Sequence, residues 1–437
     1  MNESTKRGRS PIMAVFTTVF IDMLGFGILI PVYPLLISPG SPYRVTPESW
    51  SFTDGLIMLG WLQGIFPFFL FLAAPILGQL SDRLGRRPVL AFSIFGTAVG
   101  YAVFAIGIST ANIPLLFLGR AIDGATGGNL AVAQASIGDI STNENRAKNF
   151  GLLGAAFGLG FILGPYIGGR LSGSGKNFYG LFETPSWFGA TTPFWFASIL
   201  SLINCAQIIL LLPETLKQRI ADVRIHIGRS VSNVVAGFRS TRLRVVLGST
   251  FLYNAGFTFF TTFFGVYLRN NFGFDEGKTG DYFALVGVFI VFSQALLVGR
   301  VAKRISDWKV LRFSCFGTAT MMFVYFFSPT STTAFIYMVP PFFSFFNGLT
   351  LANTTSLVSR SAEPGRQGEA MGIYSSVQNL AQVPASVLVG YITTSIASGT
   401  PLVVAGSCIL AGGLLFVTFF RPTYVGAPSS GPPPVTA

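Results

Sequence analysis

The chain has 437 residues, of which 51% are hydrophobic and only 11% are charged, and its mean hydropathy is +0.60. Because a soluble domain carries about 25% charged residues, this composition excludes an ordinary soluble protein and indicates a polytopic membrane protein. The formal charge of +12 does not indicate a nucleic-acid partner, because most Lys and Arg residues fall in alternate loops between apolar runs. This bias follows the positive-inside rule, so we expect both termini to lie in the cytoplasm.

Apolar runs long enough to cross a bilayer as helices, which takes about 20 residues each, recur along the chain. We predict six spans at 12–36, 55–80, 88–109, 113–137, 149–172 and 191–212, and six more at 245–269, 281–301, 309–328, 332–358, 367–394 and 400–420. The chain therefore divides into an N-terminal six-helix bundle (1–212), a cytoplasmic linker (213–244), a C-terminal six-helix bundle (245–420) and a disordered tail (421–437).

The first predicted span contains one acidic residue, Asp22, in a stretch that is otherwise apolar. A carboxylate this deep in a helix costs about 2.5–3.5 kcal/mol on insertion, so we expect it to face a cavity or a partner rather than lipid. In a cavity it is a candidate proton acceptor. The alternative is a structural carboxylate that only accepts hydrogen bonds.

A charged turn separates the second and third predicted spans, and its motif residues are Gly78, Asp82, Arg83, Gly85, Arg86 and Arg87. Asp139 closes the fourth span and Arg146 opens the fifth, on the same side of the membrane. Together these charges are candidates for a salt-bridge network that closes a cytoplasmic gate. Exposed ion pairs contribute only about 0–1 kcal/mol each, which suits contacts that must break in every cycle. The alternative is that the charges only fix the topology.

The fourth predicted span carries Arg120 and Asp123, whose spacing of three places both side chains on one face of a helix. An arginine inside the membrane needs an anionic partner, for which Asp123 is the nearest candidate and Asp22 the other. We expect these three residues to interact, with Asp22 or Asp123 as the anionic partner of Arg120. The alternative is a self-neutralised pair that only fixes helix packing.

The fifth predicted span is dense in small residues around one proline: Gly160, Gly164, Pro165, Gly168 and Gly169. Glycine lets neighbouring helices approach closely, and proline frees a carbonyl and bends the helix.

The second half has no charged residue in the interior of its predicted spans and offers amides and aromatic residues instead. Such groups suit an amphipathic organic substrate. The candidate cavity residues are Asn254, Gln294, Asn347 and Gln378. The alternative for each amide is a contact between helices.

These stretches resemble the major facilitator superfamily of transporters. The turn at 78–90 is similar to the family's loop between helices two and three, and Arg120 with Gly124 is similar to its fourth-helix motif, which is associated with proton coupling. The glycine–proline pattern of the fifth span resembles a motif of the antiporters of this superfamily. The halves also repeat with an offset of 221 residues, which pairs Gly78 with Gly299 and Gly127 with Gly348. The resemblance implies twelve transmembrane helices in two pseudo-symmetric six-helix bundles.

Residues 12–172 look most like tetracycline–proton antiporters and their relatives. In one departure, those antiporters carry an acidic residue in helix three where this chain has Gly100. The resemblance also implies that Asp82 approaches the N-terminus of the eleventh helix. We therefore expect an exporter of a small amphipathic organic molecule in exchange for protons, in which protonation of Asp22 or Asp123 breaks its tie to Arg120.

Two alternatives share this fold: a proton-independent uniporter or importer of a small metabolite, and a non-transporting receptor. We expect a monomer in a plasma or inner membrane, without cofactor or metal. An enzyme is not expected, because the only histidine, His226, lies in the linker and no nucleophile–base constellation is present.

Overall fold

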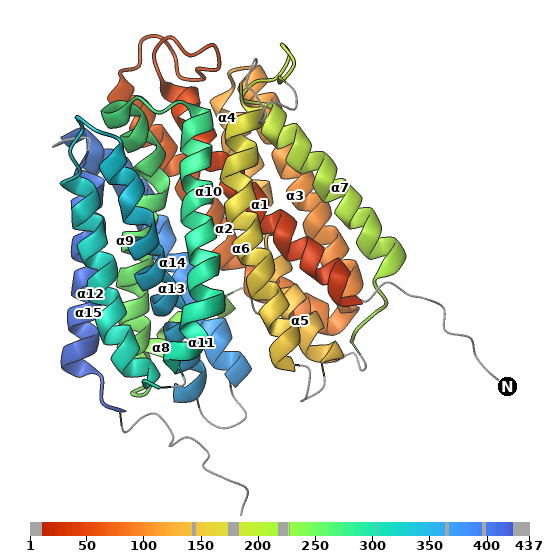
Figure 1. The fold of residues 1–437 in the computed structure, drawn as a ribbon. Coiled ribbons are helices and arrows are strands. Elements are labelled where there is room, and N and C mark those ends of the chain that lie inside the picture. Colours follow the sequence, from red (N-terminus) through yellow and green to blue (C-terminus); the bar gives the residue numbers. More distant parts are fainter. Residues whose placement is uncertain are drawn as a thin grey trace, which may run out of the picture.

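The computed structural model of the chain describes residues 11–141, 146–173, 183–216, 226, 228–302, 304–362, 367–395 and 399–422. Long helices run side by side and form two groups, one from each half of the chain (Figure 1). The first half contains α1 (Pro11–Ile37), α2 (Phe52–Leu84), α3 (Arg86–Ser109), α4 (Ile113–Thr126), α5 (Asn129–Ile140), α6 (Arg146–Leu171) and α7 (Thr192–Leu211). The second half contains α9 (Arg244–Phe272), α10 (Glu276–Phe292), the π-helix η1 (Ser293–Val298), α11 (Gly299–Ala302), α12 (Asp307–Phe326), α13 (Ala334–Ser361), α14 (Gln367–Ser395) and α15 (Thr400–Phe419).

Six of these helices are long and apolar enough by themselves to cross a membrane: α1, α2, α3, α7, α13 and α15. Two more spans are assembled from successive shorter helices, α4 with α5 and α10 with η1 and α11. The helices α6, α9, α12 and α14 complete the predicted set of spans.

The two halves pack their helices in the same way. In the first half α1 contacts α6 and α7, and α3 contacts α4 and α7; in the second half α9 contacts α14 and α15, and α12 contacts α13 and α15. The halves meet at two contacts, α2 against α14 and α6 against α10. The repeat relates α2 to α10 and α6 to α14, so each of these contacts is the counterpart of the other. The prediction of two pseudo-symmetric helical bundles is therefore confirmed.

The predicted fourth span is divided into two helices. α4 ends at Thr126, Gly127 and Gly128 form a turn, and α5 begins at Asn129. Each glycine weakens a helix by about 1 kcal/mol. A side chain at Gly128 would also overlap α2, because its Cβ would lie 2.6 Å from Cδ1 of Leu77. A break in a spanning helix is tolerated where it lines a cavity, and both glycines line the central cavity described below.

The predicted linker contains a helix, α8 (Arg229–Arg239), that the sequence pattern did not indicate. It packs against α2, α9 and α14 through the buried residues Ser230 and Gly237. α8 lies at the end of the bundle that also carries the α2–α3 loop (Figure 1). We call this end, with Arg83–Arg87 and α8, the basic end. Linker residues 217–225 and 227 and the tail from 423 lie outside the described residues, so the domain boundaries there stay predictions.

Candidate functional site

A cavity of about 340 Å³ lies between the two halves. The first half supplies its charged groups, Asp22, Arg120 and Asp123. The second half supplies amides: Asn254, Gln378, Asn379 and Gln382. Aromatic rings from both halves complete the wall: Phe26, Phe66, Tyr101, Phe161 and Phe257. The cavity can therefore contact a molecule that has both polar groups and a flat apolar surface.

Asp22 projects from α1 into this cavity, and its partner comes from the broken fourth span. The side-chain amide of Asn129, the first residue of α5, donates a hydrogen bond of 2.8 Å to Oδ1 of Asp22. Asn129 itself is buried, and its own Oδ1 accepts from the backbone N–H of Leu130. The carboxylate of Asp22 therefore accepts a hydrogen bond from a neutral amide at the wall of the cavity.

Arg120 pairs with Asp123 on its own helix, so of its two candidate partners it takes the nearer in sequence. Nη1 of Arg120 donates to Oδ2 of Asp123 over 3.0 Å, and both side chains are almost completely buried. The guanidinium also lies 4.3 Å from the centre of the Phe66 ring on α2, a favourable cation–π geometry. Its Nε has no hydrogen-bond partner among the described residues.

The structure gives a reason for glycine at position 100. A Cβ atom on Gly100 would lie 2.9 Å from the carbonyl oxygen of Gly119 and 3.0 Å from Cβ of Asp123. Since α3 has no room for a side chain there, the acidic group in this part of the cavity is supplied by α4. The next residue, Tyr101, places its hydroxyl against the backbone of Gly25 on α1.

Of the four second-half amides predicted for the cavity, the structure brings two to it. Asn254 and Gln378 line the cavity, whereas Gln294 and Asn347 are not among its lining residues. Asn347 is 1% exposed and accepts a hydrogen bond from the Tyr253 hydroxyl, which is a helix–helix contact. Gln294 lies on the π-helix η1 and is exposed. These two residues therefore do not line the cavity in this conformation.

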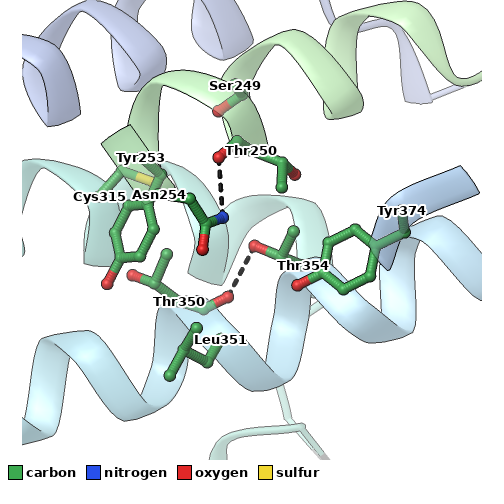
Figure 2. Close-up of a pocket in the computed structure, with 9 residues that line it drawn as sticks. All are labelled: Ser249, Thr250, Tyr253, Asn254, Cys315, Thr350, Leu351, Thr354 and Tyr374. Atoms are coloured by element: carbon green, nitrogen blue, oxygen red, sulfur yellow. Dashed lines mark hydrogen bonds between the residues drawn. The ribbon is translucent and has the colours of Figure 1, made fainter. Parts of the chain in front are cut away.

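A second, much smaller pocket of about 10 Å³ lies within the second half (Figure 2). Six residues with hydroxyl groups, from three helices, line it: Ser249, Thr250, Tyr253, Thr350, Thr354 and Tyr374. Asn254 lines both spaces and donates its amide to the carbonyl oxygen of Thr250 over 2.9 Å. A space of this size holds at most one water molecule, so a substrate can reach Asn254 only from the central cavity.

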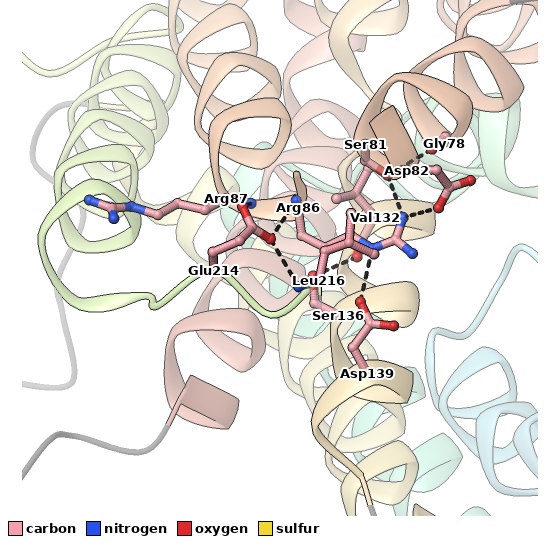
Figure 3. Close-up of polar contacts among 10 residues, drawn as sticks. All are labelled: Gly78, Ser81, Asp82, Arg86, Arg87, Val132, Ser136, Asp139, Glu214 and Leu216. Atoms are coloured by element: carbon pink, nitrogen blue, oxygen red, sulfur yellow. Dashed lines mark hydrogen bonds and ion pairs between the residues drawn. The ribbon is translucent and has the colours of Figure 1, made fainter. Parts of the chain in front are cut away.

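The charged turn forms a compact network centred on Arg86 (Figure 3). Nη1 of Arg86 contacts Oδ1 of Asp82 at 2.6 Å, and Nε contacts Oδ2 of Asp139 at 3.0 Å. The side chain of Arg83 is exposed, and Arg87 donates to the carbonyl oxygen of Ile209. The side chain of Arg146 lies outside the described part of the structure. The network therefore joins α2, α3 and α5 within the first half.

Glu214, the second residue of the predicted linker, is a further member of this network, and the sequence pattern did not indicate its role. Its carboxylate accepts the backbone N–H groups of Arg86 (2.8 Å) and Arg87 (3.3 Å), so it caps the N-terminus of α3. A side chain at Gly85, which has φ +113°, would overlap this carboxylate. The sequence feature that could have indicated this role is the position of Glu214, which follows Pro213 directly after an apolar span.

Asp82 faces the second half across open space. A hollow of about 360 Å³ separates it from the first turns of α14, where Glu369 and Gly372 line the opposite wall. This hollow shares lining residues Ala74, Ala131, Ser375 and Asn379 with the central cavity. The central cavity therefore continues toward the basic end.

The opposite end is closed by direct contacts between the halves. Arg170 of α6 and Asp281 of α10 form an ion pair of 2.7 Å. Trp61 of α2 donates its indole N–H to the hydroxyl of Tyr391 on α14 over 3.2 Å. Access to the cavity is thus one-sided in this conformation.

The glycine–proline motif of α6 lies between α1 and α10. Cβ atoms on Gly160, Gly164 and Gly168 would lie within 2.9 Å of backbone carbonyl oxygens of α1, so this face of α6 touches α1 directly. Pro165 packs against both Gly27 of α1 and Gly280 of α10, and Gly169 packs against the backbone of Glu276. These residues fix the helix packing at the interface of the two halves.

The repeat places an ion pair of reversed polarity in the second half. The offset of 221 residues relates Arg86 to Asp307 and Asp139 to Arg360. Asp307 contacts Nε of Arg360 at 3.3 Å and accepts a hydrogen bond of 2.6 Å from Ser356. In both halves an ion pair therefore joins corresponding helix ends, but the acidic and the basic residue have exchanged places.

Two repeated helical bundles around a cavity that holds charged groups and opens toward one end are typical of membrane transporters. The profile of the Major Facilitator Superfamily matches residues 15–386, so the chain belongs to that superfamily and is an integral membrane transporter, not an enzyme.

Its sequence is similar to the class H tetracycline resistance protein of Pasteurella multocida, with 27% identity over 424 residues that cover 94% of this chain and 96% of the relative. It is also similar to the class C tetracycline resistance protein of Escherichia coli, with 26% identity over 396 residues that cover 90% and 92%.

Among solved structures, the human organic anion transporter MFSD10 superimposes with a TM-score of 0.70 at 21% identity, covering 93% of this chain and 98% of that one. A D-xylose–proton symporter superimposes with a TM-score of 0.71 at 17% identity, covering 94% and 98%. At these identities the structural likeness shows the fold.

Proposed function

We propose that the protein exports a small amphipathic organic molecule in exchange for protons, by alternating access between the two halves. The observation that carries this proposal is the presence of Asp22 and the Arg120–Asp123 pair in the wall of one cavity. Charged groups inside a membrane protein are expensive, and they typically mark ion or proton pathways. The similarity to tetracycline resistance proteins supports a drug-like substrate and proton exchange.

Each carboxylate has a distinct part in this mechanism. Asp22 is held by an amide and faces the cavity, so it takes up a proton without breaking an ion pair. Protonation of Asp123 removes the anionic partner of Arg120 and frees the guanidinium to move. Inward proton movement supplies about 2.3 kcal/mol per charge for each 100 mV of membrane potential, which is enough to bias a balanced conformational equilibrium.

We propose that the basic end is cytoplasmic, as the positive-inside rule requires. The conformation described here is then inward-facing, since the cavity continues toward the basic end and the opposite end is closed by Arg170–Asp281. Substrate enters from the cytoplasm in this state. Export requires the end closed by Arg170–Asp281 to open after the basic end has closed.

The test uses purified protein in liposomes with an imposed pH gradient and two fluorescent probes, ethidium and tetracycline. Gradient-driven transport is expected for the wild type and for Glu48→Gln, a control in an exposed loop. Asp22→Asn and Asp123→Asn are each expected to lose coupling. If both variants keep gradient-driven efflux, the coupling assignment is wrong.

The same experiment separates the two alternatives. Counterflow of a probe at a rate that ignores the pH gradient would identify a uniporter. Thermal stabilisation of the purified protein by a probe, without any flux, would identify a receptor.

A further inference from the structure

A groove of about 620 Å³ lies on the basic end, away from the transport cavity. It is formed by the end of α8, the beginning of α9 and the end of α15. Its lining residues are Phe238, Thr241, Arg244, Val245, Gly248, Leu415, Phe419 and Arg421. None of these residues contributes to the central cavity, so the groove needs a separate explanation.

Two arginines give the groove a strong positive charge. Arg244 is the first residue of α9, and Arg421 follows the last turn of α15, so both residues lie where these spans end. Both residues are exposed, and no ion pair joins either one to a described acidic residue. An arginine presents a planar fork of donors that matches a phosphate group.

The deeper part of the groove is apolar. Gly248 lies one helical turn into the span from Arg244 and forms the floor, where a Cβ would be 3.6 Å from Cδ2 of Leu415 and 3.9 Å from Cε1 of Phe238. Phe419 is 67% exposed on the other wall. The groove is therefore charged at the membrane surface and apolar toward the membrane interior.

α8 continues this amphipathic surface. Val231, Val235 and Phe238 follow each other at helical spacing and are exposed, while Ser230 and Gly237 on the other face are buried. A helix with an exposed apolar face and basic residues beside it binds at the interface of an anionic membrane.

We propose that this groove binds one anionic phospholipid, with the phosphate between Arg244 and Arg421 and the acyl chains along Gly248, Leu415 and Phe419. Basic pockets between spanning helices are suited to anionic headgroups. A soluble phosphate would leave the apolar wall uncovered, whereas a lipid covers both parts of the groove. α8 belongs to the segment that connects the two halves. The bound lipid would also stabilise the packing of α8 against the second half.

Native mass spectrometry of the delipidated full-length protein tests this proposal, with dioleoyl phosphatidylglycerol and dioleoyl phosphatidylcholine added separately. Wild type is expected to retain phosphatidylglycerol more strongly. Each of Arg244→Gln and Arg421→Gln is expected to weaken that binding about fivefold, and the double variant to remove the preference. Arg304→Gln, an exposed arginine outside the groove, serves as the matched control. Equal retention by the double variant and the control would overturn the proposal.

A second variant tests the apolar part independently of charge. Gly248→Leu keeps both arginines and fills the floor, where only flexible side chains are near, so it is expected to lose phosphatidylglycerol without a change in thermal unfolding. Undiminished binding by this variant would refute the groove as the site. Complete displacement of the lipid by millimolar inorganic phosphate would refute a lipid as the occupant.

Discussion

The Arg120–Asp123 pair allows a prediction of stability with a defined magnitude. The two side chains are 4% and 5% exposed, and they face each other at 3.0 Å. Asp123→Asn keeps the shape of the side chain but leaves the guanidinium without its ion-pair partner. Removal of one partner from a buried pair typically costs about 3–5 kcal/mol. Because Arg120 also lines the cavity and keeps its contact with Phe66, we expect the lower end, about 3 kcal/mol.

Unfolding in mixed detergent–dodecyl sulfate micelles, followed by circular dichroism, measures this free energy. The double variant Arg120→Gln/Asp123→Asn removes both charges and is expected to recover most of the loss. Asp22→Asn is the matched control, because its carboxylate is only part-buried and accepts from a neutral amide, and it should cost about 1 kcal/mol or less. If Asp123→Asn unfolds like the wild type, or the double variant is no more stable than the single one, the ion pair does not stabilise the fold as argued.

Three further predictions concern the network, the helix packing and the closed end. Glu214→Ala removes the cap of α3 and should lower the free energy of unfolding by about 1 kcal/mol, whereas the exposed Glu183→Ala should not; equal effects would contradict the capping role. Gly164→Val places Cβ 2.5 Å from a carbonyl oxygen of α1 and should abolish a monodisperse peak in size-exclusion chromatography; a normal elution profile would show that α1 and α6 can separate. Arg170→Gln removes the ion pair to Asp281 and should speed the labelling of a cysteine introduced at the cavity residue Gln378, in a variant without the native cysteines, by an impermeant maleimide added on the side opposite the basic end; an unchanged rate would show that other contacts keep this end closed.

Hydropathy predicted the spans to within a few residues, because the length of a spanning helix is set by the bilayer. Asp22, Arg120 and Asp123 could be singled out because a charge inside a span needs a special environment. The partner of Asp22 could not be predicted. Asn129, which donates to it, begins α5 directly after the break at Gly127 and Gly128, and a pair of glycines is also compatible with a continuous, closely packed helix.

The amides of the second half show a different limit of prediction from sequence. Asn254 and Gln378 reach the cavity while Asn347 lies in a helix contact with Tyr253, although all of them sit in similar apolar surroundings in the sequence. The direction in which a polar side chain faces depends on how its helix is rotated about its own axis. Because polar and apolar residues are mixed on the faces of these spans, the sequence does not define that rotation. Glu214 was missed for a related reason, since its role depends on the tertiary approach of the segment after α7 to α3.

The reversed polarity of the two ion pairs, Arg86–Asp139 and Asp307–Arg360, places their charges differently relative to the helix dipoles. Asp307 lies in the first turn of α12 and Arg360 in the last turn of α13, so each charge is favoured by the dipole of its own helix. Arg86 begins α3 and Asp139 lies in the last turn of α5, so there each dipole opposes the charge, and the carboxylate of Glu214 offsets only part of this at α3. Each such effect amounts to about 0.3–1 kcal/mol. The helix dipoles therefore favour the charges of the second-half pair and oppose those of the first-half pair, where the buried Arg86 is held by two carboxylates, Asp82 and Asp139, instead of one.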